Sequence, residues 1–124
     1  ALPLLAGGVA VASVCLALLA LGVRAGHLFL WSLFFGCATA VVLSYALFAR
    51  RHPTEMAGRV NGALNVWVFV GMFTGQWVVG LILNHWPPTA TGYAPEAYGW
   101  ALGLLWLVQA SGLAWLWAGR RAFT

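Results

Sequence analysis

The stretch VNGALNVWVFVGMFTGQWVVGLILN, residues 60–84, contains no Asp, Glu, Lys or Arg. A helix needs about 20 apolar residues to cross the roughly 30 Å hydrocarbon core of a bilayer, because each residue adds about 1.5 Å. Residues 1–23, 28–49 and 97–119 are three further stretches of similar length without a charged side chain. We therefore expect an all-α membrane protein with four antiparallel transmembrane helices, which form one transmembrane region over residues 1–124.

The overall composition excludes most soluble classes. The chain is 63% hydrophobic and 6% charged, whereas a soluble domain has about 25% charged residues. Its 124 residues suffice for four spans with short loops and leave no room for a soluble catalytic domain. We expect no enzyme activity and no cofactor. Because the chain begins at Ala1 without methionine, inside an apolar run, we interpret it as a piece of a longer protein whose preceding helices are its partners.

The arginines lie outside the four stretches and are unevenly distributed between their two sides. Arg24 stands alone between the first and second stretches, whereas the other five flank the opposite ends. Cytoplasmic loops carry an excess of Lys and Arg, so both chain ends are predicted to be cytoplasmic, in a bacterial inner membrane. We expect these arginines to interact with the lipid bilayer. We expect no nucleic-acid partner. The arginines expected to anchor the helices at the interface are Arg50, Arg51, Arg59, Arg120 and Arg121.

Amide side chains form one face of the span at residues 60–84. Asn61, Asn65, Phe69, Met72 and Gln76 fall within about 80° of one another at 100° per residue. Buried amides in a membrane need partners of protein or water. They are candidates for substrate or gating contacts, and interhelical hydrogen bonding remains an equally open interpretation.

The second stretch carries two hydroxyls at helical spacing, Ser32 and Thr39. They suit a cavity lining or close helix contact, and bonding to their own helix is the alternative. Tyr45 belongs to the aromatic residues expected at the inner membrane interface.

Small residues predict where helices approach closely. Glycines four residues apart let backbones come into contact within a membrane. Gly7 and Gly8, with neighbouring alanines, offer the first stretch a packing surface as an alternative to facing lipid. The glycines expected to pack helices in the later stretches are Gly58, Gly62, Gly71, Gly75, Gly99 and Gly103.

No catalytic or metal-binding set emerges from the residue types present. The chain has no Asp and no Lys, and its two glutamates precede the third and fourth stretches. The three histidines are divided between the two sides of the expected membrane, so we predict no metal site.

Residues 50–83, RRHPTEMAGRVNGALNVWVFVGMFTGQWVVGLIL, resemble the major facilitator superfamily of secondary transporters. The resemblance covers a cytoplasmic loop with a proline and the helix that follows it. The residues that carry it are Pro53, Gly58, Arg59, Val60, Asn61, Gly62, Asn65, Gly71, Gly75 and Gly80.

The resemblance implies that the chain is helices nine to twelve of a twelve-helix transporter fold. The second stretch would line the central cavity, the third would lie at the seam between the two halves, and the first and fourth would be peripheral. Such proteins move a small-molecule substrate by alternating access around a site near the bilayer midplane. Asn65 and Gln76 are then the first substrate-binding or gating candidates, followed by Thr39, Ser32 and Asn61.

Two other functions stay open at this point. A non-transporting membrane scaffold or assembly subunit would use the same glycines and amides for packing alone. A small four-helix multidrug exporter has about this length, but that class depends on a glutamate in its first helix. Residues 1–23 contain no acidic residue, which disfavours the exporter.

Overall fold

The computed structural model describes residues 2–119, and Arg120 and Arg121, two of the expected anchors, lie outside this part. The described chain is helical apart from its connections and one isolated β-bridge. Its elements are α1 (Leu2–Ala20), α2 (His27–Ala38), the 3₁₀ turn η1 (Thr39–Val42), α3 (Leu43–Ala49), the 3₁₀ turn η2 (Thr54–Met56), α4 (Ala57–Leu83) and α5 (Pro95–Ala118).

Four helical segments are long and apolar enough to cross a membrane: Leu2–Ala20, His27–Ala49, Thr54–Leu83 and Pro95–Ala118. These segments confirm the four stretches expected from the sequence, by length and composition. The third begins several residues before its predicted start at residue 60, because η2 leads directly into α4. The fourth begins at Pro95, which a first helical turn tolerates because that position needs no backbone N–H donor.

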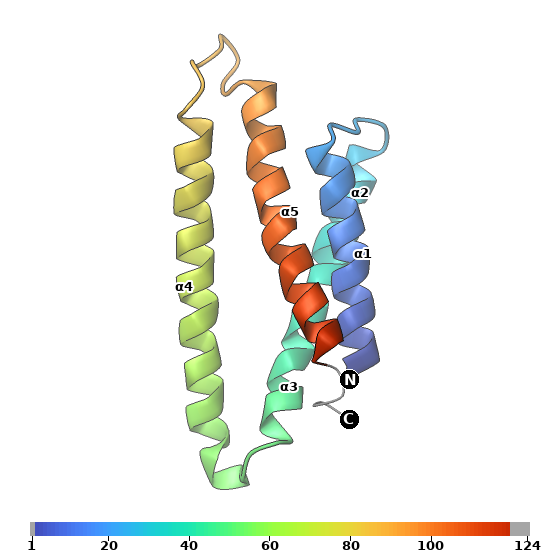
Figure 1. Cartoon of the computed structure of the whole chain (residues 1–124), viewed down its shortest axis with the longest axis vertical. Coiled ribbons are helices and arrows are strands. Elements are labelled where there is room, and N and C mark those ends of the chain that lie inside the picture. Colours follow the sequence, from blue (N-terminus) through green and yellow to red (C-terminus); the bar gives the residue numbers. More distant parts are fainter. Residues whose placement is uncertain (1, 120–124) are drawn as a thin grey trace.

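Helix α1 makes the most extensive contacts with the other helices. It contacts α5 most extensively, then α2 and η1 (Figure 1). Six of its residues are buried, and nearly all are apolar or small: Leu5, Ala12, Ser13, Cys15, Leu16 and Leu19. From the sequence, this span was expected either to face lipid or to pack through its small residues. The structure favours packing.

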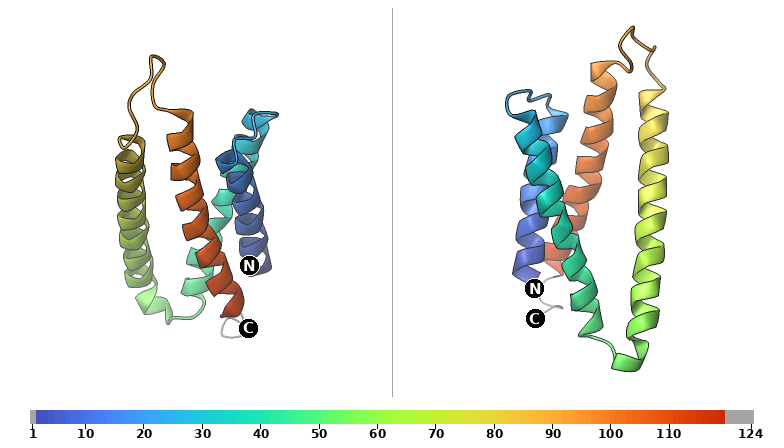
Figure 2. Two further views of the ribbon diagram at one scale, coloured as in Figure 1. Left: turned by 45° about the horizontal axis from the view of Figure 1, so that its top comes forward. Right: turned by 180° about the vertical axis from the view of Figure 1, so that it is seen from behind.

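Helix α4 is much less extensively packed than α1. It packs only sparsely on α5 and α3, and α5 stands between it and α1 in all three views (Figures 1 and 2). None of its residues is buried. The helices of the described chain therefore do not enclose the span that carries the amide face.

The second span, His27–Ala49, is helical throughout but not uniformly α-helical. Four residues of 3₁₀ turn, η1, interrupt it between α2 and α3. This break lies against Gly8 of α1, where an added Cβ would stand 2.5 Å from the Ala40 Cβ and 3.0 Å from the Cys37 carbonyl oxygen. The expected packing at Gly8 is confirmed, whereas the neighbouring Gly7 has nothing within 4 Å.

The connections lie at two opposite ends of the helices. The 21–26 turn and the 84–94 loop are at one end, and the connection from α3 to η2 is at the other (Figure 1). Gly22 and Gly26, with φ of 78° and 67°, supply the left-handed conformations of the 21–26 turn. Arg24 therefore lies at one end of the structure, while Arg50 and Arg51 lie in the connection at the other.

Candidate functional site

The best-defined polar contact between spans joins α3 to α4. The Tyr45 hydroxyl donates a hydrogen bond to Oδ1 of Asn65 over 2.6 Å. The two helices are neighbours because only a short connection, residues 50–53, separates α3 from η2. The bond leaves the Asn65 amide nitrogen, with its two N–H donors, available to a further partner.

Asn61 lies one helical turn before Asn65 on the same face of α4. Its Oδ1 atom is buried and accepts no hydrogen bond from the described residues. A buried acceptor without a donor costs about 1–3 kcal/mol. Near the start of α4, the amide face therefore combines one carbonyl that accepts a hydrogen bond, on Asn65, with one buried carbonyl that accepts none, on Asn61.

Gln76 lies farther along α4, about 16 Å from Asn65 at 1.5 Å per residue. It borders a shallow cavity of about 370 Å³ that Leu105 of α5 closes on the other side. Within the described part of the chain its amide makes no hydrogen bond. The other residues that line this cavity are Gly71, Met72, Gly75 and Val79.

The two hydroxyl candidates are separate from the amide face. Ser32 donates to the Leu28 carbonyl oxygen over 2.8 Å, and Thr39 donates to that of Gly36. Both bonds lie within their own helical segment, as the packing interpretation of these residues expected. Each hydroxyl oxygen keeps its acceptor lone pairs, so a role in substrate contact stays a prediction.

The glycines predicted to pack helices have few neighbours in the described structure. A Cβ added at Gly99 would lie 3.4 Å from the Ala20 carbonyl oxygen of α1. The remaining five, Gly58, Gly62, Gly71, Gly75 and Gly103, have no such atom within 4 Å. Close packing at these five positions stays a prediction.

No feature of the sequence singles out Tyr45 as part of this site. Its position near an expected helix end identified it only as an interfacial aromatic. The usable signal is the short connection at residues 50–53, which forces α3 and α4 to be neighbours. That signal predicts contact between the helices but not the register that aligns Tyr45 with Asn65.

Chemically, the site offers three amides and one phenol, which suit reversible hydrogen bonding to a polar solute. Between residues 2 and 119 no three His, Cys, Asp or Glu side chains group together as metal ligands do. No family model, curated protein or solved structure matches the chain.

Proposed function

We propose that this chain is the C-terminal segment of a secondary active membrane transporter that moves a small solute by alternating access. Its four antiparallel helices would correspond to helices nine to twelve of the major facilitator superfamily, with both ends of the segment cytoplasmic. Preceding helices of the same protein complete the transporter, and the membrane is a bacterial inner membrane.

The observation that carries this proposal is the uncovered amide face of α4. Asn61 has a buried acceptor without a hydrogen bond, Asn65 keeps two free donors, and Gln76 makes no hydrogen bond and borders a cavity. Polar side chains are costly in a membrane unless they meet protein or water. A face with this much unused hydrogen-bonding capacity favours a hydrated substrate path.

The distribution of burial supports the same assignment. The two spans that carry the polar candidates, His27–Ala49 and Thr54–Leu83, have no buried residue, whereas one third of the most apolar window of α1 is buried. In a transporter, the uncovered spans would face the preceding helices and the cavity between the two halves.

Thiol labelling tests the proposal without knowledge of the substrate. In the protein at its natural length, with Cys15 and Cys37 replaced by alanine, cysteine is introduced at position 65, 76 or 70. Val70 lies on the opposite side of α4, about 140° from the centre of the amide face at 100° per residue. Asn65→Cys and Gln76→Cys should react with a membrane-impermeant maleimide at least about tenfold faster than Val70→Cys.

The labelling pattern separates the alternatives. Equal, slow reaction at all three positions would show that no water reaches the amide face and would favour a scaffold in which amides only pack helices. Alternating access also requires that a ligand or ion gradient change the labelling rates, because water reaches the midplane from one side at a time.

A further inference from the structure

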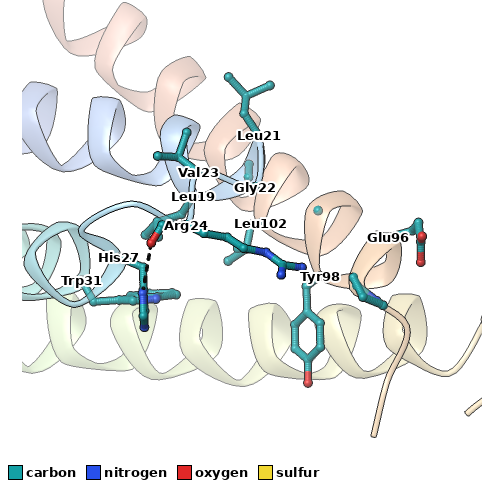
Figure 3. Close-up of a pocket in the computed structure, with 13 residues that line it drawn as sticks. Leu19, Leu21, Gly22, Val23, Arg24, His27, Trp31, Glu96, Tyr98 and Leu102 are labelled. Carbon is teal, nitrogen blue, oxygen red and sulfur yellow. Dashed lines mark hydrogen bonds between the residues drawn. The ribbon is translucent and has the colours of Figure 1, made fainter. Parts of the chain in front are cut away.

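A second cavity lies at the end of the helices that holds Arg24. It has a volume of about 810 Å³ and lies between the 21–26 turn, the start of α2 and the start of α5 (Figure 3). Leu19, Leu21 and Leu102 give it apolar walls, and Trp31 lines its α2 side. None of the transport candidates discussed above contributes to it.

Two opposite charges share the wall of this cavity. Arg24 enters from the turn and Glu96 from the first turn of α5. Figure 3 shows the Arg24 side chain extending from the turn toward α5, with the Glu96 carboxylate turned away from it. The two make no ion pair with each other, and in the part of the chain that the structure describes neither side chain has another partner. Both charges are therefore available to one ligand that carries a negative and a positive group.

An apolar groove continues from this charged end along α1 and α5. A cavity of about 710 Å³ shares Ala20, Leu21, Glu96 and Gly99 with the first. Its further lining consists of Ala17, Trp100, Gly103 and Trp106. From Glu96 to Trp106 the groove follows α5 for about 15 Å, or half of the hydrocarbon thickness. Apart from Glu96, every residue of this second part is apolar.

This combination matches one class of membrane molecule. We propose that the groove binds a phospholipid with a phosphate and a primary ammonium in its headgroup, of the phosphatidylethanolamine type. The planar Arg24 guanidinium suits two oxygens of the phosphate. The Glu96 carboxylate accepts hydrogen bonds from the ammonium, and an acyl chain lies in the groove past Gly99 and Gly103.

The charges select among headgroups. A phospholipid with only a negative headgroup satisfies Arg24 but brings a second negative charge near Glu96. A quaternary ammonium has no N–H group to donate to the carboxylate. The inference depends on the chain lying in a membrane and is independent of transport, so either proposal can fail without the other.

Native mass spectrometry tests the inference on the protein at its natural length. The protein is reconstituted in equal amounts of phosphatidylethanolamine, phosphatidylglycerol and phosphatidylcholine, then released in mild detergent. We expect one retained phospholipid per chain, mainly phosphatidylethanolamine. Arg24→Gln should lower retention of every phospholipid about tenfold, since one charge-assisted hydrogen bond contributes about that factor.

Glu96→Gln separates headgroup selection from general binding. It should lower the ratio of phosphatidylethanolamine to phosphatidylglycerol about fivefold while total retention changes little, as expected for loss of one charged partner. Arg50→Gln and Glu55→Gln remove the same charges at the other end of the helices and should leave both quantities unchanged. An unchanged headgroup ratio in Glu96→Gln would overturn the assignment.

A charge-neutral variant keeps the test decisive if the charged variants fold poorly. Gly103 lines the groove, and nothing lies within 4 Å of a Cβ added there, so the side chain of Gly103→Leu should extend into the groove. Retention should fall at least about tenfold while the helical circular dichroism is preserved. Full lipid retention in Gly103→Leu, or a lipid-free dimer of the wild-type protein, would show that the groove has a different occupant.

Discussion

Helices α1 and α4 are both apolar enough to cross a membrane, yet the described chain buries one and leaves the other uncovered. Six residues of α1 are buried and none of α4. Both helices contain glycines, but only Gly8 of α1 has a neighbouring helix in close contact, whereas Gly71 and Gly75 of α4 have none. Hydropathy therefore identifies a span without telling which neighbours it has, and close packing depends on a partner that fits the small residues.

The polar residues follow the same division. The most polar side chains of α1 are Ser13 and Cys15, and both are buried. Helix α4 carries Asn61, Asn65 and Gln76, with one interhelical hydrogen bond among them. The helix that is rich in hydrogen-bonding groups thus has no buried residue. This arrangement is expected of a helix that serves a ligand or helices outside the described set.

The largest expected effect tests the packing of α1. Gly8→Val places a side chain where the first carbon alone would stand 2.5 Å from the Ala40 Cβ. Overpacking of this kind costs about 1–3 kcal/mol, and we expect the upper end because α1 and η1 would have to separate. The measurement is the free energy of unfolding in mixed detergent micelles, followed by tryptophan fluorescence.

Gly7→Val is the matched control for this variant. Gly7 precedes Gly8 and has open space around an added Cβ, so its free energy of unfolding should change by less than about 0.5 kcal/mol. If the two variants lost stability equally, Gly8 of α1 would not lie in close contact with η1. The conclusion that α1 is the most extensively packed helix would then be wrong too.

A smaller effect of opposite sign is expected on α4. Asn61→Leu removes a buried oxygen that has no donor and replaces it with an apolar side chain of similar size. Because an unsatisfied buried acceptor costs about 1–3 kcal/mol, the variant should be more stable than the wild type by about 1 kcal/mol. A loss of stability would mean that Asn61 already has a partner, and the argument for an open polar face would weaken.

The sequence allowed the four spans to be predicted, because a run of apolar residues long enough to cross a bilayer needs no tertiary information. The break at Thr39–Val42 was missed, since it accompanies the close approach of Gly8 from another helix. The amide face of α4 followed from helical spacing alone. Its contact with Tyr45 depends on the register between two helices, which no local pattern specifies.

The smallest expected effect measures the hydrogen bond between the side chains of Tyr45 on α3 and Asn65 on α4. Tyr45→Phe and Asn65→Leu each remove the 2.6 Å hydrogen bond, and the double variant completes a thermodynamic cycle. Hydrogen bonds between membrane helices contribute on average about 0.6 kcal/mol, so the coupling free energy of unfolding should be near that value. Asn65→Leu combined with Tyr98→Phe is the control pair, because Tyr98 lies on α5 beside the cavity that Arg24 lines. The coupling free energy of this control pair should be zero within error. A Tyr45–Asn65 coupling near zero would leave α4 with no specific polar contact to the other described helices. The amides would then have to find all their partners outside residues 2–119.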